Sequence, residues 1–295
     1  MKKMEAMIFD IKRFAVHDGD GIRTTVFFKG CPLRCIWCHN PEGLSGKPAL
    51  SFTEHKCAFC GRCASVCSCH VISDGKHIFR RENCTSCGKC VPVCPADALC
   101  VYGKKINEEE LLKILLEDRD FYETSGGGIT LSGGECLLQA EFCARLLKRC
   151  KEENLRTAVD TCGFVPFESL LAVKPYTDRF LYDVKAFDEE VHARCTGVSN
   201  RLILENLKKL DESGAKIEIR IPFVPDCNDA EIEKIGEFLA GLSNVVGVRV
   251  LAYHNLAATK YRALDLPDTL PKVLPEKDAL SRAEETLRKK GLMVL

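Results

Sequence analysis

This chain of 295 residues has no excess of either charge, because 42 lysines and arginines balance 42 aspartates and glutamates. A neutral balance gives no support for bulk attraction to nucleic acid or to an anionic membrane. The sequence also lacks an apolar run of membrane length, and Lys2 and Lys3 are not followed by the apolar core of a signal peptide. We therefore expect a cytoplasmic globular protein with no nucleic-acid or membrane partner.

Cysteine, by contrast, is abundant. In a reducing compartment, 19 cysteines favour metal ligation over a disulfide framework, especially since eleven of them form three tight arrays. Seven of the other eight are expected to pack in the core as small hydrophobes, and Cys69 is left unassigned because it lies close to one array. The seven are Cys100, Cys136, Cys143, Cys150, Cys162, Cys195 and Cys227.

The first array is Cys31, Cys35 and Cys38, spaced C-x3-C-x2-C directly after an apolar run. Three thiolates are one ligand short of the usual four, but a [4Fe-4S] cluster held by three cysteines keeps one iron open for a substrate or cofactor. The alternatives are a structural zinc corner completed by His39 or a chance grouping in a cysteine-rich chain. Zinc corners usually come as paired C-x2-C units, and no such pair is left once the other arrays are assigned.

The array, with Trp37 just before its last cysteine, resembles the signature of radical S-adenosylmethionine (radical SAM) enzymes. The flanking segments, residues 18–23 and 38–41, resemble the glycyl-radical-enzyme activating enzymes of the pyruvate formate-lyase activase group. This resemblance covers residues 8 to about 264. It implies an oxidoreductase that cleaves S-adenosylmethionine reductively to a 5'-deoxyadenosyl radical, which abstracts hydrogen from a glycine of a partner glycyl radical enzyme. Flavodoxin or ferredoxin is the implied electron donor.

The other two arrays form an internal repeat within residues 49–104. A C-x2-C-x2-C-x3-C pattern starts at Cys57 and recurs 27 residues later at Cys84. The second copy ends in Cys-Pro, as in two-cluster ferredoxins, where the fourth cysteine of each run ligates the other cluster. One [4Fe-4S] cluster would then take Cys57, Cys60, Cys63 and Cys94, and the other Cys84, Cys87, Cys90 and Cys67.

The first run departs from the pattern at Ser68, where proline is expected. Zinc is the alternative metal for these eight cysteines, but the close spacing suits a cubane cluster better than a tetrahedral site. We expect a ferredoxin-like insert at 49–104 that divides a catalytic core into residues 1–48 and 105–295, giving three [4Fe-4S] clusters in all.

Strand and helix patterns alternate through the remaining chain. Strands are expected at 8–16, 22–29, 129–132, 155–160, 179–184, 215–222 and 245–252. Helices are expected at about 108–117 and 136–151, after Pro166, up to Asp211, and from Asn228. Alternation of this kind implies a parallel sheet with right-handed crossovers. About six βα repeats predict an α/β fold, an incomplete (β/α)6 radical SAM barrel carrying the inserted domain.

Polar residues gather at the expected carboxyl ends of these strands, where barrels of this kind place their chemistry. Along residues 216–221 the isoleucines occupy one face, so Arg220 is expected to point into the barrel. Each polar residue also has an ordinary structural explanation, such as a tight turn or a helix cap. S-adenosylmethionine needs acceptors for its ammonium and cations for its carboxylate, and this set offers both.

The resemblance assigns roles to these residues. Gly133, Gly134 and Glu135 match the motif at the methionine amino group, Lys185 and Arg220 the carboxylate partners, and His254 a late histidine contact. Trp37 and the backbone by His39 border the adenine, while Asp160, Thr161 and Asp183 match positions that hold a monovalent cation. Val184 and Ala186 beside Lys185 are further cofactor contacts, and Asp18 is placed near the glycyl substrate. Cys136 and Asp20 depart from the family's usual residues without touching a ligand.

Two other functions stay open from the sequence. One is a radical enzyme on the same core that acts on a small molecule. The other is a polyferredoxin-like electron carrier, against which the set of Gly133, Gly134, Glu135, Lys185 and Arg220 argues. No residue in the sequence encodes the choice of partner or the oligomeric state.

Overall fold

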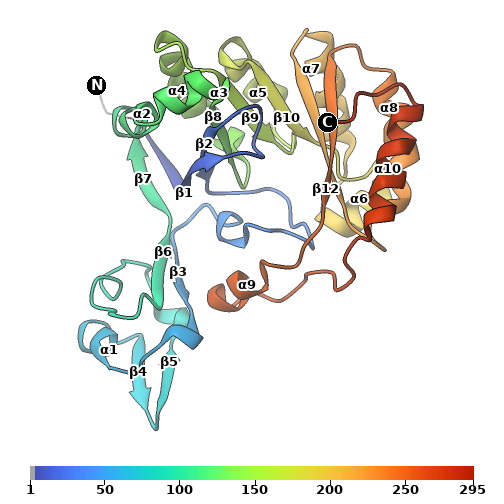
Figure 1. Cartoon of the computed structure of the whole chain (residues 1–295). Helices are drawn as coiled ribbons and strands as arrows, with labels where there is room; N and C mark the ends of the chain where they lie inside the picture. Colours follow the sequence, from blue (N-terminus) through green and yellow to red (C-terminus); the bar gives the residue numbers. More distant parts are fainter. Residues whose placement is uncertain (1–3) are drawn as a thin grey trace.

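A computed structural model describes residues 4–295 and contains one large mixed sheet (Figure 1). The strand order is β12-β11-β10-β9-β8-β2-β1-β7. The strands are β1 (Glu5–Ala15), β2 (Arg23–Phe28), β7 (Lys104–Asn107), β8 (Gly128–Gly133), β9 (Thr157–Thr161), β10 (Arg179–Asp183), β11 (Ile217–Phe223) and β12 (Val245–Ala252).

Six of these strands, from β2 through β8 to β12, run parallel, which agrees with the six repeats counted in the sequence. The first expected strand is not one of them: β1 pairs antiparallel with both β2 and β7. The parallel part therefore has all of its carboxyl ends at one edge, and β1 and β7 extend the sheet beyond β2.

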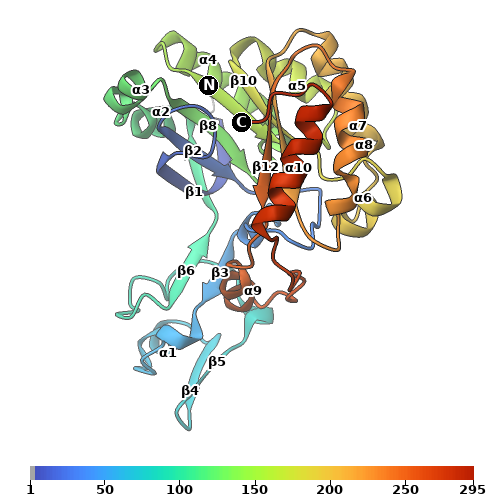
Figure 2. The ribbon, with the colours of Figure 1, turned by 45° about the vertical axis from the view of Figure 1, so that its right-hand side comes forward.

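Within the described residues, seven helices lie between strands of the sheet along the chain and cover it (Figures 1 and 2). They are α2 (Glu108–Leu116), α3 (Arg119–Ser125), α4 (Ala140–Glu152), α5 (Phe167–Val173), α6 (Glu189–Thr196), α7 (Arg201–Glu212) and α8 (Ile232–Ala240). After β12 come α9 (Ala258–Leu264), which lies apart from these helices, and α10 (Lys277–Lys289), which packs against α8. Helix α4 shows why these helices pack on the sheet, because its apolar residues fall on one face and that face is buried. The buried residues are Phe142, Cys143, Leu146, Leu147 and Cys150. The expected helix from residue 136 starts as a 3-10 turn, Cys136–Gln139, before α4 begins.

The core lies between the sheet and these helices. On β11, Ile217, Ile219 and Ile221 are fully buried in this cluster, while Arg220 projects from the other face of the strand. No helix within residues 4–295 is long and apolar enough to span a membrane.

Residues 49–102, in the second part of the segment between β2 and β7, form a small lobe that extends from the sheet (Figures 1 and 2). It contains β3 (Ala49–Phe52), α1 (Arg62–Val66), β4 (His70–Ser73), β5 (Lys76–Phe79) and β6 (Leu99–Tyr102). Strands β3 and β6 pair at its base, and β4 and β5 form a hairpin. The lobe has its own core of Leu50, Cys63, Cys90 and Leu99.

Helix α9 connects this small lobe to the first cysteine array. Lys260 on α9 donates hydrogen bonds to the His39 carbonyl at 3.0 Å and to Glu42 at 2.6 Å. From the small lobe, Arg81 donates to the carbonyl of Ala263 at 3.0 Å. Neither α9 nor α10 was expected from the sequence patterns, and α9 holds both the cysteine loop and the lobe in place.

Candidate functional site

The three cysteines of the first array lie on the wall of a cavity of about 320 Å³ at the carboxyl ends of the parallel strands. The cysteine loop follows β2 and is fixed by backbone hydrogen bonds to the end of α6. Arg34 N–H donates to the Thr196 carbonyl at 2.7 Å, and Ile36 N–H donates to the Cys195 carbonyl at 2.9 Å. The fold therefore brings Cys31, Cys35 and Cys38 to one wall of this cavity.

Burial disfavours the charged thiolate form of Cys35 and Cys38 in this loop. Burial raises the pKa of Cys35 to about 12 and that of Cys38 to about 11. Thiolates there need a nearby cation to be stable. Three convergent sulfur ligands that require positive charge fit a [4Fe-4S] cluster with one iron free of protein ligands.

Two cationic side chains line the same cavity. Lys185 follows β10 and donates to the Asp183 carboxylate at 2.6 Å. Burial alone would lower the pKa of Lys185, but Asp183, Cys35 and Cys162 together more than offset it, so the pKa is raised and the amine stays charged. Arg220 on β11 is only 7% exposed and donates to the carbonyl of His17. Its Nε atom is buried and has no hydrogen-bond partner among the described residues, which leaves one donor for an anionic ligand.

Carboxylates surround Arg220. Asp160 lies 3.3 Å from its guanidinium and Asp18 lies 3.7 Å away. Burial raises the pKa of Asp160 to about 6, although Arg220 and a hydrogen bond from the Ser132 hydroxyl favour its charged form. Asp18 lines the cavity and accepts a hydrogen bond from Thr25 at 2.8 Å.

Gly133 and Gly134 form the cavity wall where the end of β8 touches the cysteine loop. A Cβ at Gly134 would lie 2.2 Å from the Gly30 carbonyl oxygen and 2.7 Å from that of Gly43. Gly133 has φ +125°, a conformation that side chains disfavour. This pair therefore lets two backbone segments meet beside the cysteines, and leaves main-chain groups exposed to the cavity.

The Glu135 side chain does not line the cavity. It is fully buried and accepts hydrogen bonds from Leu137 N–H at 3.0 Å, the Thr161 hydroxyl at 2.8 Å and Cys162 N–H at 2.8 Å. Burial raises the pKa of Glu135, and these hydrogen bonds oppose that rise. Both Glu135 and Thr161 are thus committed to joining β8 to β9, so their side chains are not available to a ligand in this arrangement.

Trp37 and His39 line the cavity, whereas His254 does not. His254 is exposed and its ring stacks on that of His39, with centroids 4.0 Å apart and parallel planes. His39 Nε2 is 2.8 Å from the His254 carbonyl oxygen and donates to it. Val184 and Ala186 are buried on either side of Lys185 and also lie outside the cavity lining.

Cys162 is a cavity residue that the sequence pattern assigned only to core packing. It is 6% exposed, as expected for packing, but it lines the cavity after β9 and donates a hydrogen bond to Cys31. That contact is the largest factor lowering the pKa of Cys31. Its position directly after Thr161, at a strand end, was the signal available in the sequence.

The cysteines of the small lobe form two sets. Cys57, Cys60, Cys63 and Cys94 line one small cavity together. Cys90 is buried near Cys67, Cys84 and Cys87; burial and then these neighbours raise its pKa to about 11. Both groupings are the crossed ones expected from the repeat, with the fourth cysteine of each run beside the other run.

The two runs also share a backbone conformation. Phe59 and Ser86, which are 27 positions apart, both have positive φ, 53° and 55°. Their N–H groups donate to the sulfur two residues earlier, at 3.4 Å to Cys57 and 3.3 Å to Cys84. Amides directed at sulfur and four convergent thiols in each set fit iron–sulfur ligation.

Most of the scattered cysteines pack as expected, because Cys136, Cys143, Cys150 and Cys195 are buried and Cys227 is half-buried. The expectation is wrong for Cys100, which is exposed. It lies on β6 next to buried Leu99, so strand alternation turns it away from the lobe's core. Cys69 is buried, and its thiol donates a hydrogen bond to Cys67 of the second set.

Known proteins resemble the chain over nearly its whole length. The Radical SAM superfamily matches residues 25–239. The choline trimethylamine-lyase activating enzyme of Oleidesulfovibrio alaskensis is 43% identical and covers 98% of this chain and 97% of its own. The trans-4-hydroxy-L-proline dehydratase activating enzyme of Clostridioides difficile is also 43% identical, over 88% of this chain and 87% of its own.

A solved structure supports the same assignment. A domain of the pyruvate-formate lyase-activating enzyme from Bacteroides vulgatus is 31% identical, with a TM-score of 0.50, over 58% of this chain and 98% of that one. With three cysteines and two cationic side chains around one cavity at the strand ends, the chain belongs to the radical SAM superfamily and is an enzyme of its glycyl-radical-enzyme activating group.

Proposed function

We propose that this enzyme cleaves S-adenosylmethionine reductively and uses the resulting 5'-deoxyadenosyl radical to abstract hydrogen from a glycine of a partner glycyl radical enzyme. The observation that carries the proposal is the cavity itself. It combines three cysteine thiols with the charged groups of Lys185 and Arg220 within about 320 Å³. An electron carrier without chemistry of its own has no use for such a cavity.

The residues of the cavity suit the parts of S-adenosylmethionine. Arg220 presents an unpaired buried Nε, and Lys185 a charged amine, to the carboxylate of the methionine moiety. Main-chain groups of Gly133 and Gly134 face the ammonium. Trp37, which is 5% exposed, and the backbone by His39 border the adenine. A [4Fe-4S] cluster on Cys31, Cys35 and Cys38 would supply the electron for the cleavage and an iron free of protein ligands.

The protein's own contribution is to orient the cofactor and keep water out. Arg220 is held by Asp160, Asp18 and the carbonyl of His17, so its direction is fixed before a ligand arrives. Asp18 adjoins both Arg220 and the cavity, and we place it near the glycyl substrate. A monovalent cation beside Asp160 and Asp183 stays a prediction. Thr161 is a weaker candidate ligand, because its side chain is buried outside the cavity lining and its hydroxyl oxygen already accepts a hydrogen bond from Gly163 N–H.

For the remaining residues we propose more limited roles than the family resemblance assigns to them. Glu135 acts through its buried position in the turn, and its carboxylate does not bind the cofactor. Val184 and Ala186 contribute backbone and packing beside Lys185. His254 acts by stacking on His39, which positions the loop after Cys38.

Cofactor cleavage in variants tests the proposal. Reconstituted, reduced protein should convert S-adenosylmethionine to methionine and 5'-deoxyadenosine, and Cys35→Ala should abolish this. Cys100→Ala is the matched control, because Cys100 is exposed and outside all three arrays. Cleavage retained in the Cys35→Ala protein refutes the proposed site, and equal loss in both variants means that the effect is not specific to the cavity.

For the small lobe, we propose a ferredoxin-like insert at residues 49–104, between core segments 1–48 and 105–295. The crossed cysteine groupings support two [4Fe-4S] clusters in it, one on Cys57, Cys60, Cys63 and Cys94, the other on Cys84, Cys87, Cys90 and Cys67. Cys60 and Cys87 are exposed, so both sets reach the surface where flavodoxin or ferredoxin would deliver electrons. Iron and sulfide analysis should give three clusters per chain, and fewer than three would refute the two-cluster insert.

A further inference from the structure

A short hairpin in the small lobe places two histidines over the first cysteine set. Strands β4 and β5 are joined by Asp74 and Gly75, whose φ values of 51° and 70° are those of the tight turn that an Asp-Gly pair favours. In this hairpin His70 pairs with Phe79, and His77 pairs with Ile72. Because these two pairs lie two positions apart, both histidine side chains project from the same face.

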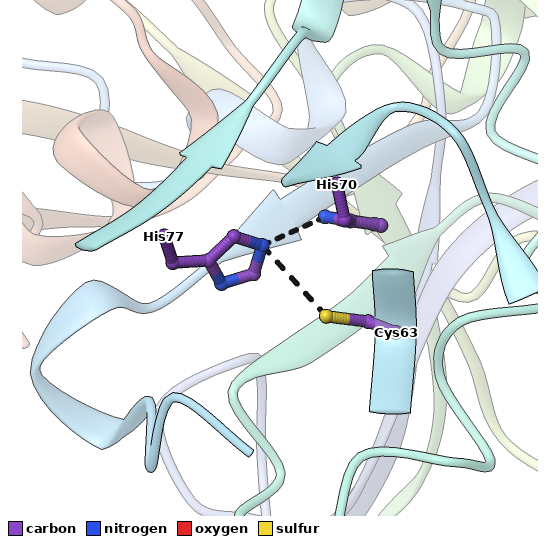
Figure 3. A group of neighbouring side chains, drawn as sticks. All are labelled: Cys63, His70 and His77. Carbon is purple, nitrogen blue, oxygen red and sulfur yellow. Dashed lines mark hydrogen bonds between the residues drawn. The ribbon is translucent and has the colours of Figure 1, made fainter. Parts of the chain in front are cut away.

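The ring of His77 faces both His70 and Cys63 (Figure 3). Its Nδ1 is 3.3 Å from the sulfur of Cys57. Its Nε2 is 2.9 Å from Nδ1 of His70 and 3.8 Å from the sulfur of Cys63 (Figure 3). Phe52 packs on this ring with centroids 4.3 Å apart, which limits its rotation.

The surroundings of His70 decide which nitrogen carries the hydrogen. His70 is 2% exposed, and its Nε2 is buried without a partner among the described residues. A hydrogen on that nitrogen would be an unpaired buried donor, so the hydrogen belongs on Nδ1, which donates to Nε2 of His77. Nδ1 of His77 then carries the other hydrogen and donates to Cys57.

The second cysteine set lacks an equivalent. Within residues 4–295, the hydrogen-bond contacts between a histidine ring and a cysteine are those of His77 with Cys57 and Cys63. Beside the second set lies the Cys69 thiol instead, which donates to Cys67. The two halves of the repeat therefore share their backbone donors but differ in this imidazole.

We propose that His77 donates a hydrogen bond to the Cys57 ligand and thereby raises the reduction potential of the first insert cluster above that of the second. This inference rests on the two-cluster insert of the proposed function. A reduced cluster carries more negative charge on its sulfurs, so a hydrogen bond stabilises the reduced form more than the oxidised form. Of the two insert clusters, the one at Cys57 is then the better electron acceptor.

The test is a redox titration of the full-length reconstituted protein, monitored by electron paramagnetic resonance. Iron is measured in every sample. His77→Phe keeps an aromatic ring beside Phe52 but removes the donor. We expect all iron to be retained and one insert cluster to shift to a more negative potential. His77→Gln, which keeps an N–H donor, should shift it less, and His55→Phe, at an exposed histidine without a cysteine contact, should not shift it.

The titration of His77→Phe is repeated in a Cys87→Ala background, which removes the second insert cluster. A shift that persists there belongs to the first insert cluster. Unchanged potentials in His77→Phe with full iron content overturn the proposal. If His77→Phe loses iron, His77→Leu is measured in its place, and iron loss in both overturns the proposal by making His77 a ligand or a structural residue. A wild-type protein with fewer than three clusters refutes the two-cluster insert itself, a result separate from an unchanged potential.

Discussion

The guanidinium of Arg220 lies 3.3 Å from the carboxylate of Asp160 on the cavity wall, and both side chains are largely buried. The pair joins the ends of two strands, β11 and β9, that are not neighbours in the sheet. Because the Nε of Arg220 has no hydrogen-bond partner within residues 4–295, the pair leaves the arginine with one unused donor. An ion pair that served only stability would gain from satisfying that donor, so this geometry favours a ligand-binding role.

Replacing Arg220 with alanine should weaken S-adenosylmethionine binding while leaving the iron content unchanged. The loss of one charge-assisted hydrogen bond corresponds to roughly 1.5–3 kcal/mol of binding free energy. Isothermal titration calorimetry on the reconstituted protein measures it directly. Arg220→Lys, which keeps the charge, should lose less, and unchanged binding in Arg220→Ala would mean that Arg220 is only a structural ion-pair member.

Substitution of Gly134 by alanine should disrupt the contact between β8 and the cysteine loop. The new Cβ would lie 2.2 Å from the Gly30 carbonyl oxygen, so backbone must move, at a cost of roughly 1–3 kcal/mol in stability. Urea unfolding and iron retention report the effect. Gly46→Ala in the same loop is the control, since its Cβ meets nothing within 4 Å; equal stability of the two variants would contradict the close approach.

Asp160 should make the stability of the cofactor-free protein depend on pH. Its pKa is raised from 3.8 to about 6, chiefly by burial, so the folded state holds the proton more tightly than the unfolded chain. The contribution of Asp160 to the free energy of unfolding therefore falls as pH rises from about 4 to about 6, by up to about 3 kcal/mol. Urea unfolding across this range should show that the stability of Asp160→Asn relative to the wild type increases as pH rises, and parallel profiles would contradict the raised pKa.

Removal of one insert cluster should distinguish between two roles of the insert, an electron relay and a structural support. Cys87→Ala is expected to lose the second cluster, which iron analysis confirms. If the insert clusters pass electrons, activation driven by flavodoxin falls while activation driven by a small chemical reductant is kept. The small reductant reaches the cluster at Cys31, Cys35 and Cys38 directly. Equal loss with both reductants would mean that the insert supports the fold or docks the partner.

Local patterns in the sequence predicted the parallel sheet, the positions of its strand ends and the facing of Arg220. Alternation along β11 and helical spacing along α4 depend on residues close in sequence, so they are readable without a structure. The crossed grouping of the cysteines could be predicted because the two runs, 27 residues apart, have the same cysteine spacing as two-cluster ferredoxins.

Contacts between distant residues were not predictable in this way. Cys162 meets Cys31 across 131 positions, and Lys260 meets Glu42 across 218, so no local pattern links them. The Glu135 carboxylate was matched to a cofactor motif, but its partners at Thr161 and Cys162 follow from the packing of β8 against β9. His77 was missed because a lone histidine in a strand gives no sign of the sulfur it faces.

Formation of a glycyl radical on a partner enzyme is the most direct consequence of the proposed function. Reduced protein with S-adenosylmethionine is mixed anaerobically with any glycyl radical enzyme encoded near it and with partners of the matched relatives, such as choline trimethylamine-lyase, and the mixtures are examined by electron paramagnetic resonance. A glycyl radical signal is expected on at least one partner, absent without S-adenosylmethionine and absent with Cys35→Ala. Cleavage of S-adenosylmethionine without a radical on any of these partners would contradict the proposed function and favour a small-molecule substrate.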